Sequence, residues 1–550
     1  MKKAPPPIIW SIAGHDSSGG AGLSADQRAA DALGVHLCPV VAAITAQNSQ
    51  GVDAVFAVDP AHLDAQLETL ARDLPPTAIK TGLLGSVAAI QTVARWVDQV
   101  RAATPDGVDP HRHLALIVDP VLRASAGGVR FTDERILVAY REELLPRATV
   151  ITPNRGEAWR LLGPGSEEMR VPALAQALRA LGTRSVVITG GDDAAAATHQ
   201  HALDWLDTPQ ARGWLSAPRV DTPDHHGTGC TFATGVASAW AVGHLEADAV
   251  VLAKMLTHHA LSRSHTAGSG PGPVIANNGF AAGPEHGGAP LPWLGLGEAL
   301  PWRLTPSGPG QDSACFQRFR PPADGLYGIV ADAPSLRRAL QAGWRCLQLR
   351  HKSTEGLPAQ LRDSIRAGGE VGAQLFVNDH WRETLALTTP PDQGTPPSLG
   401  LHLGQEDLLA MDPEDHALLR SARPRLMLGV SSHSLWELAR AAGLGASYIA
   451  CGPVQATTTK DMPWHPQGLD NLRWWTAHSP APVVAIGGLL TSDDVHRFAT
   501  AGPAALCLVR GMGGPNDDMA SILAGLRQAV TRGRHAQGER RPAALPHPVL

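Results

Sequence analysis

The chain has 550 residues, more than one hydrophobic core usually organises, so two or more domains are expected. With 43% hydrophobic residues, 18% charged residues and a formal net charge of −5, the composition is that of a soluble globular protein and excludes nucleic acid as the main partner. Six scattered cysteines without a CxxC pair exclude a disulfide framework and a structural zinc site, and they favour a reducing cytosol.

The N-terminus gives no indication of export. A triple proline at residues 5–7 interrupts it before an apolar run of signal-peptide length can form. The most apolar stretch, residues 230–256, is broken by polar and charged side chains and is not a membrane span. We therefore expect a cytoplasmic protein that is not embedded in a membrane.

From residue 8 to about residue 274, short apolar runs alternate with Ala- and Leu-rich segments of helical period. The clearest runs, Ile8–Ala13, 114–119, 149–152 and 185–189, have the length and composition of buried parallel strands. Such alternation predicts a layered α/β/α domain over residues 1–275.

The pattern collapses into Gly, Pro and isolated aromatic residues over residues 276–322, which predicts a linker. A second alternating series over residues 323–532 contains eight strand candidates: GLYGIVAD, RCLQLRHK, QLFVND, LGLHLGQ, LMLGVSSH, SYIACGPV, PVVAIGG and AALCLVRG. Eight such units predict a (β/α)8 TIM barrel. The basic, Pro-containing end, residues 533–550, is expected to be a disordered tail.

The sharpest chemical motif is HHGTGC at residues 225–230, followed by a helix of small residues. Gly227, Thr228 and Gly229 place free backbone N–H groups at the helix start, which predicts a phosphate cradle. Cys230 at that position is expected to have a lowered pKa and to take a proton from an alcohol that attacks a γ-phosphate. A buried structural cysteine is the alternative.

Two further segments support a phosphoryl-transfer site. The loop AGHDSSGGAG at residues 13–22, with Asp26 shortly after it, can close over a small polar molecule. Asn154 and Glu157 follow a strand and could organise hydrated Mg²⁺ near phosphates, or could simply cap the next helix.

These segments, together with TAQNSQGV, KTGLLG, VDPV and ITPNRGEA, resemble the hydroxymethylpyrimidine/phosphomethylpyrimidine kinases of the ribokinase-like superfamily over residues 8–274. The resemblance implies ATP as co-substrate and Mg²⁺ as cofactor. It implies that Gly14, Asp26 and Gln47 bind the pyrimidine, and that Cys230 is the base. It also implies ATP and phosphate binding by Asn154, Glu157, Gly227, Thr228 and Gly229.

One position departs from this family. Thr189 stands where the family has a lysine before a Gly pair, which removes an ammonium contact to phosphate and makes the second phosphorylation an open question. Another cation elsewhere in the site is the alternative.

In the barrel, polar groups follow the strands at their C-terminal ends, where barrel active sites lie. Arg350 and Lys352 follow the second strand and could grip a diphosphate. Asp379 and Asp407, after the third and fourth strands, are oxygen ligands suited to Mg²⁺ beside it.

Later strands add a second group of anion-binding residues. Ser431, Thr457, Thr459 and Lys460 offer hydroxyls and an ammonium, and the seventh and eighth strands end in GG and RG, a frequent phosphate site in barrels. Two anion sites in one mouth predict two phosphorylated substrates. Taken singly, each of these residues has the alternative of being a solvated surface charge or a helix cap.

The segments GLYGIVAD, QLRHK, VND, HLGQEDL, GVSSH, GPVQATTTK and AIGGL resemble thiamine-phosphate synthase over residues 325–527. The resemblance implies that Arg350, Lys352, Lys460 and Mg²⁺ on Asp379 and Asp407 stabilise a departing diphosphate. The implied diphosphate and substrate ligands are Gln348, Arg350, Lys352, Asn378, Ser431, Thr457, Thr459 and Lys460. The implied thiazole-phosphate ligands are Gly488, Val509 and Arg510.

The barrel also departs from its family at three places: His351 replaces an Asp, Arg510 replaces a Ser, and a Pro-rich insertion spans residues 388–398. Together the two halves indicate a bifunctional enzyme whose partners are hydroxymethylpyrimidine, ATP and thiazole phosphate, without nucleic acid or membrane; a homo-oligomer is left open. The alternative is a pyridoxal-type kinase fused to a non-catalytic barrel.

Overall fold

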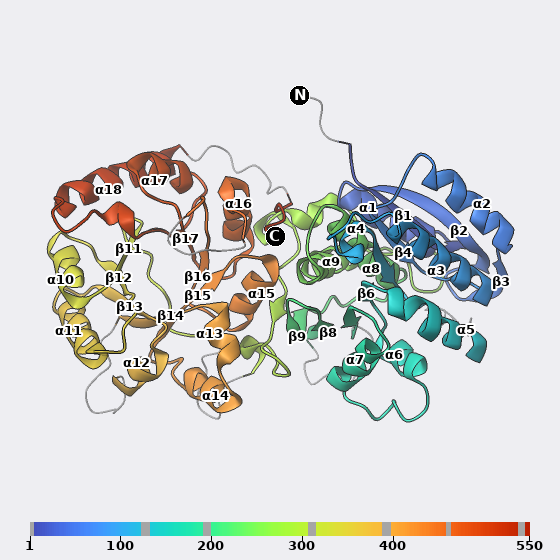
Figure 1. Ribbon diagram of the computed structural model, residues 1–550, viewed down its shortest axis with the longest axis horizontal. Coiled ribbons are helices and arrows are strands. Elements are labelled where there is room, and N and C mark those ends of the chain that lie inside the picture. The colour runs from blue at the N-terminus through green and yellow to red at the C-terminus, as the bar shows by residue number, and fades with distance from the viewer. Residues whose placement is uncertain are drawn as a thin grey trace. The chain divides into compact units, whose positions relative to one another are not determined.

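The computed structural model of the protein describes residues 5–122, 133–190, 200–305, 315–387, 398–457, 464–536 and 545–550. The chain divides into two compact units, Met1–Pro292 and Trp293–Leu550, and most of their helices and strands are labelled in Figure 1.

The N-terminal unit is built on one sheet. Its strands are β1 Ile8–Asp16, β2 His36–Gln47, β3 Val52–Ala57, β4 Ala78–Thr81, β5 Ala115–Val118, β6 Val150–Ile151, β7 Ser185–Ile188, β8 His201–Asp207 and β9 Arg212–Pro218. Within this unit they lie in the order β9-β8-β7-β6-β5-β4-β1-β2-β3. The central strands run parallel, while β3 pairs antiparallel with β2, and β8 pairs antiparallel with both β7 and β9.

Helices flank this sheet on both faces (Figure 1). They are α1 Gly22–Ala32, α2 Pro60–Ala71, α3 Val87–Arg101, α4 Pro110–His113, α5 Glu134–Ala139, α6 Arg155–Leu162, α7 Val171–Ala180, α8 Thr228–Ala241 and α9 Glu246–Leu261. Short helical turns are η1 Tyr140–Leu144, η2 Leu145–Arg147, η3 Asn278–Ala281 and η4 Pro284–His286. Helix α8 packs against α1, α9 and the central strands, which brings the HHGTGC motif to the sheet.

The C-terminal unit contains a closed barrel of eight parallel strands in sequential order, β11 to β18. They are β11 Leu326–Val330, β12 Cys346–Leu349, β13 Gln374–Asn378, β14 Leu399–Leu403, β15 Met427–Ser432, β16 Tyr448–Cys451, β17 Val483–Ile486 and β18 Ala505–Leu508. Each coincides with one of the eight predicted strands, and β11 pairs with β18 to close the barrel. The predicted α/β/α sheet and TIM barrel are both confirmed.

Helices surround this barrel in Figure 1. They are α10 Ala333–Gln341, α11 Leu357–Glu370, α12 Trp381–Leu387, α13 Gln405–Ala410, α14 Pro413–Ser421, α15 Leu435–Gly443, α16 Gly468–His478, α17 Ser492–Ala499 and α18 Met519–His535. The unit also has β10 Trp293–Leu294, η5 Trp302–Leu304 and η6 Arg510–Met512. The Pro-rich insertion lies outside the described residues except for Ser398.

The described parts of the segment 276–322 differ from the expected linker. Two of its aromatic residues are buried: Phe280 is 0% exposed in the N-terminal unit, and Phe319 is 1% exposed in the barrel core beside Tyr327 and Tyr448. Glycine and proline dominate the composition of this segment, but the few aromatic side chains decide where it packs. The two units therefore share it, with the division after Pro292.

The tail also differs from the prediction. Helix α18 continues to His535, and residues 545–550 pack in the C-terminal unit. The backbone N–H of His547 donates to Asn471 at 2.8 Å, and the apolar side chain of Val549 is only 4% exposed. Residues 537–544 lie outside the described part of the chain.

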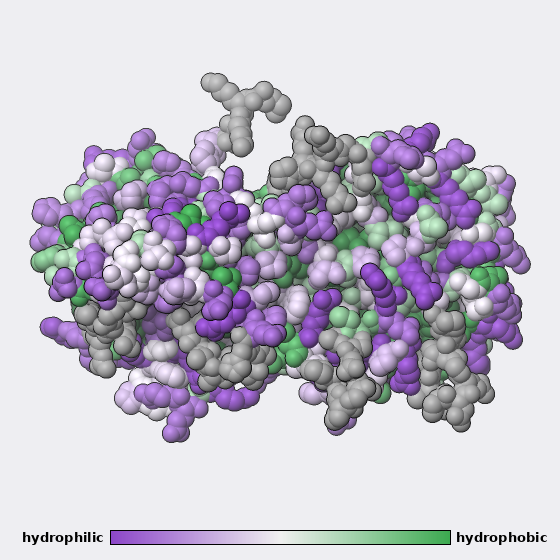
Figure 2. Space-filling view, turned by 180° about the vertical axis from the view of Figure 1, so that it is seen from behind, coloured by the Kyte–Doolittle hydropathy of each residue, from purple (hydrophilic) through white to green (hydrophobic). Residues whose placement is uncertain are grey.

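Surface character is mixed. On the face shown in Figure 2, hydrophobic residues lie scattered among hydrophilic ones. Within the described residues, no helix combines the length and apolar character that crossing a membrane requires.

Candidate active sites

A cavity of about 480 Å³ opens at the carboxyl ends of the parallel strands of the N-terminal unit. This edge is where open α/β sheets bind their ligands. The cavity lining includes eight of the predicted site residues: Gly14, Gln47, Asn154, Glu157, Gly227, Thr228, Gly229 and Cys230.

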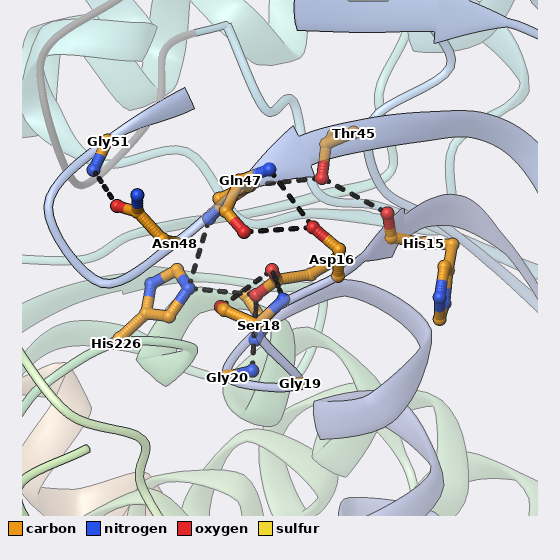
Figure 3. A network of polar contacts seen from close by, with 12 residues as sticks. His15, Asp16, Ser18, Gly19, Gly20, Thr45, Gln47, Asn48, Gly51 and His226 are labelled. Atoms are coloured by element: carbon orange, nitrogen blue, oxygen red, sulfur yellow. Dashed lines mark hydrogen bonds and ion pairs between the residues drawn. The ribbon is translucent and has the colours of Figure 1, made fainter. Parts of the chain in front are cut away.

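Asp16, at the end of β1, ties the glycine-rich loop to the HHGTGC motif (Figure 3). Its carboxylate accepts hydrogen bonds from the Ser18 amide at 2.8 Å, the Ser18 hydroxyl at 2.7 Å and the Ala21 amide at 2.7 Å. His226 Nε2 lies 2.9 Å from the same carboxylate. Burial raises the pKa of Asp16, but these hydrogen bonds outweigh it and hold the pKa well below its usual value.

The two loops touch so closely that glycine is required in both. A Cβ on Gly20 would lie 2.2 Å from the His226 ring, and one on Gly227 would lie 2.3 Å from the Gly20 carbonyl oxygen. Gly227 also has φ of +89°, which favours glycine. The loop after β1 and the start of α8 therefore form one wall of the cavity.

Gln47 ends β2 and faces this wall (Figure 3). Its side-chain oxygen accepts a hydrogen bond from Thr45 at 3.3 Å, and its Nε2 lies 3.2 Å from His226 Nε2. The side chain is thus held at the cavity surface, where the resemblance places a pyrimidine ligand.

Cys230 is the third residue of α8 and lies beside Asp119 and Lys80. Burial raises the pKa of its thiol to about 12; Lys80 opposes this effect, and the nearby carboxylates add to it. This direction is opposite to the one expected from a helix start, because the thiol loses solvent and faces acidic neighbours. At neutral pH the resting thiol keeps its proton.

Asp119 is a site residue that the sequence analysis quoted in VDPV without assigning it a role. It lines the cavity, and one of its carboxylate oxygens accepts no hydrogen bond in the described structure. Burial raises its pKa to about 6, although Lys80, 3.9 Å away, opposes the shift. Its position directly after β5, on the same sheet edge as Asp16, is the signal that could have identified it.

Asp26 does not line the cavity, so the structure gives no support to its predicted contact with a pyrimidine. It is 0% exposed in α1, and both its oxygens lie 2.9 Å from Lys80 Nζ. Ser11 and Thr234 donate further hydrogen bonds at 2.6 and 2.7 Å. The carboxylate is satisfied inside the protein, beneath the site.

Asn154 and Glu157 form a capping box at the start of α6 and also line the cavity. The Asn154 side chain accepts from the Glu157 amide at 2.9 Å, and Glu157 accepts from the Asn154 amide at 2.9 Å. Thr189 lines the cavity too. Lys254 lines the cavity as well, and its buried ammonium donates a hydrogen bond to Asp204 at 2.6 Å. The cavity therefore contains a cation although residue 189 is a threonine.

The barrel has its own cavity of about 240 Å³ at the carboxyl ends of its strands. The lining includes ten predicted residues: Gln348, Arg350, Asn378, Asp379, Asp407, Ser431, Thr457, Gly488, Val509 and Arg510. Thr459 and Lys460 lie outside the described residues.

Lys352 is exposed and is absent from the lining formed by the described residues. The expectation that it projects with Arg350 assumed that the strand continues, but β12 ends at Leu349. Beyond that point the alternation of side chains no longer applies.

The acidic residues of this mouth fit a hard cation. Asp379 has φ of +66°, and no described residue donates a hydrogen bond to its carboxylate. Asp407 lines the same cavity and accepts from the Gly404 amide at 2.7 Å. The described residues contain no cluster of three or more His, Cys, Asp or Glu ligands, but Mg²⁺ is commonly held by one or two carboxylates with substrate phosphates and water.

His402 is a lining residue that the sequence analysis missed. It stands near the end of β14 between Leu401 and Leu403, and the inward-facing period of the strand is the signal that could have identified it. Burial lowers its pKa to about 4, helped by Arg350 and His433 and opposed by Glu406. The ring is neutral at physiological pH.

Two family models match the chain: phosphomethylpyrimidine kinase over residues 16–275 and thiamine monophosphate synthase over residues 329–512. A probable thiamine biosynthetic bifunctional enzyme of Oryza sativa subsp. japonica is 30% identical over 511 residues, covering 90% of this chain and 83% of that protein. A hydroxymethylpyrimidine/phosphomethylpyrimidine kinase of Synechococcus elongatus is 37% identical over 269 residues, covering 49% of this chain and 96% of that kinase. Among solved structures, an ADP complex of Bacillus subtilis pyridoxal kinase is 31% identical, covers 49% of this chain and 97% of that chain, and has a TM-score of 0.42. With both domain models matched in order and a full-length relative of this kind, the chain belongs to the family of bifunctional thiamine biosynthetic enzymes.

Proposed function

We propose that the N-terminal unit transfers phosphoryl groups from ATP to hydroxymethylpyrimidine and then to its monophosphate. The barrel then joins the pyrimidine diphosphate to thiazole phosphate, giving thiamine phosphate and diphosphate. The observation that supports this most directly is that each unit gathers carboxylates and anion-binding groups in one cavity at its strand ends.

In the kinase unit, Gly14 and Gln47 would hold the pyrimidine, and the backbone of Gly227 and Gly229 would bind the transferring phosphoryl group. Asn154 and Glu157, with Asp119, would serve the Mg²⁺–ATP complex, in which Mg²⁺ neutralises phosphate charge. Cys230 would accept the alcohol proton as a thiolate. Lys80 favours that thiolate, although burial keeps the resting thiol protonated.

In the barrel, the main task is to stabilise the diphosphate as its bond to the pyrimidine methylene carbon breaks. Arg350 would bind its oxygens, and Asp379 and Asp407 would hold the Mg²⁺ that neutralises it. Thr457, Thr459 and Lys460 would join Arg350 around the diphosphate. Gly488, Val509 and Arg510 would bind the thiazole phosphate, where Arg510 adds a charge.

The test is a one-pot reaction with the purified chain, hydroxymethylpyrimidine, ATP, Mg²⁺ and thiazole phosphate, followed by chromatography for thiamine phosphate. Formation of thiamine phosphate is expected, with loss of product when Mg²⁺ is chelated. A parallel panel compares kcat/KM for hydroxymethylpyrimidine and pyridoxal. Preference for pyridoxal, or a barrel unable to couple purified pyrimidine diphosphate, would contradict the proposal.

A further inference from the structure

A chain of polar side chains crosses the barrel interior beneath the synthase cavity. The Tyr327 hydroxyl donates to Gln348 Oε1 at 3.1 Å, and the Tyr327 and Tyr448 hydroxyls lie 2.9 Å apart. Tyr448 also lies 2.7 Å from His402 Nδ1, and His402 Nε2 lies 3.0 Å from the Ser431 hydroxyl. This chain of hydrogen bonds joins side chains from five strands of the barrel. Its two end residues, Gln348 and Ser431, both line the cavity.

The two tyrosine hydroxyls of this chain lie in apolar surroundings that offer few other hydrogen-bond partners. Both are 1% exposed, and Tyr448 packs against Phe319 and Phe376 with ring centroids 5.0 and 5.1 Å apart. Gly429 makes room for this ring, since a Cβ there would lie 2.2 Å from Tyr448 Cζ. In such apolar surroundings an unmade hydrogen bond is costly, so each hydroxyl is held to the chain.

The proton count gives this chain a direction. Gln348 Nε2 donates to Asn378 at 2.7 Å, which leaves Gln348 Oε1 as the acceptor for the single proton of Tyr327. Tyr327 can then only accept from Tyr448, and Tyr448, having donated its proton, can only accept from His402 Nδ1.

The ring of His402 is neutral and carries one N–H, so a protonated Nδ1 leaves Nε2 as an acceptor. Nε2 accepts the Ser431 proton. The oxygen of Ser431 is thereby left to accept a hydrogen bond from a ligand in the cavity, and the second amide hydrogen of Gln348 is left to donate one.

This pattern of one acceptor and one donor matches an aminopyrimidine. The amino group donates, and a ring nitrogen accepts. A pyrimidine with an oxo group in place of the amino group offers an acceptor where Ser431 also offers one, and a site built on hydrogen bonds rejects such a mismatch strongly.

We propose that Tyr327 and Tyr448 are positioning residues that fix the direction of this chain, so that the synthase cavity selects an amino- over an oxo-pyrimidine diphosphate. The proposal rests on the coupling reaction described above. It adds the origin of base selectivity, which lies in two tyrosines that do not line the cavity formed by the described residues.

The first test is kinetic and uses Tyr448→Phe in the full chain. Without the Tyr448 oxygen, the His402 proton moves to Nε2, and the Ser431 proton turns into the cavity. We expect the ratio of coupling kcat/KM for the amino- over the oxo-pyrimidine diphosphate to fall about ten- to hundredfold, the range of one misplaced buried hydrogen bond. Tyr140→Phe, in the other unit, is the matched control and should leave the ratio unchanged.

The second test reads the tautomer directly by ¹⁵N NMR of histidine-labelled protein, with His402→Gln assigning the resonance. The wild-type ring should carry its proton on Nδ1. Tyr327→Phe should move the proton to Nε2, because Tyr448 then loses its acceptor and donates to the ring instead. A purely packing role for the tyrosines would not produce this change.

The outcomes distinguish failure of the directed hydrogen-bond chain from failure of the proposed coupling reaction. A wild-type proton on Nε2, or an unchanged selectivity ratio in folded Tyr448→Phe, would overturn the directed chain. If neither pyrimidine diphosphate is coupled by the wild type, the proposed coupling reaction fails, whereas the NMR tautomer is still measured independently.

Discussion

Two side chains, a thiol and a carboxyl group, are candidates for the proton acceptor in the kinase site. Cys230 stands where the resemblance places the base, but burial raises the pKa of its thiol to about 12. Asp119 lies beside it with a pKa of about 6 and is ionised at neutral pH. The two candidates therefore predict different dependences of phosphorylation on pH.

We expect kcat/KM for phosphorylation of hydroxymethylpyrimidine to rise about tenfold per pH unit between pH 7 and pH 9. The reason is that the thiolate fraction of a group with a pKa of about 12 grows throughout this interval. Initial rates at saturating Mg²⁺–ATP measure the profile, and Cys230→Ala should lower the rate by about 10²- to 10⁴-fold.

A plateau above about pH 7 in the wild type would instead identify Asp119 as the base. Asp119→Asn is the matched variant for that outcome. In it the plateau should disappear if the carboxylate accepts the proton.

Single residues were predictable from sequence where a backbone motif fixes them. Gly227 and Gly229 line the cavity because glycine and helix starts leave N–H groups free, a local property. Asp26 could not be placed in the same way. Its burial depends on Lys80, Ser11 and Thr234, which come from three other elements.

At the scale of elements, that ion pair connects α1 to the central strands. Lys80 in β4 and Asp26 in α1 are both 0% exposed, and Thr234 adds α8 to the same junction. Burial lowers the pKa of Lys80, but Asp26 and its other acidic neighbours outweigh burial and leave the pKa raised, so the ammonium stays charged.

We expect Lys80→Met to destabilise the N-terminal unit by about 3 to 5 kcal/mol, because it leaves the Asp26 carboxylate buried and without its cation. Urea unfolding followed by circular dichroism measures the change. Since the barrel has its own core, its transition should stay in place.

The double variant Lys80→Met/Asp26→Asn is the control and should recover part of the lost stability, because the charge of Asp26 is removed together with its partner. Asp26→Asn alone distinguishes the structure from the sequence-based assignment. An unchanged KM for the pyrimidine fits a structural pair, whereas a large rise in KM with normal stability would restore Asp26 as a ligand.

Strands with a regular apolar pattern could be predicted from the sequence. A segment whose packing depends on a few isolated aromatic residues could not. All eight barrel strands match their apolar runs, because a parallel strand buried on both faces shows in sequence by itself. The ends were less accurate: β12 stops at Leu349, so Lys352 leaves the mouth. The segment 276–322 was misjudged because composition weighs Gly and Pro, whereas Phe280 and Phe319 determine its packing.

At the scale of the whole molecule, the described lining residues of each cavity come from a single unit. Cys230 and Asp379 line different cavities, so each reaction should depend on one residue and be indifferent to the other. The pyrimidine diphosphate made in the first reaction is the substrate of the second. It must therefore reach the barrel either through solution or by transfer within one molecule.

We expect Cys230→Ala to lose phosphorylation while it still couples purified pyrimidine diphosphate, and Asp379→Ala to show the reverse. Because a pyrimidine diphosphate released by one molecule can be bound by another, an equimolar mixture of the two variants should convert hydroxymethylpyrimidine to thiamine phosphate. The progress curve of the mixture should show a lag that shortens as protein concentration rises. Loss of both activities in either folded variant would contradict separate sites, and a mixture that stays inactive although each variant keeps its own reaction would show that the intermediate does not pass through solution.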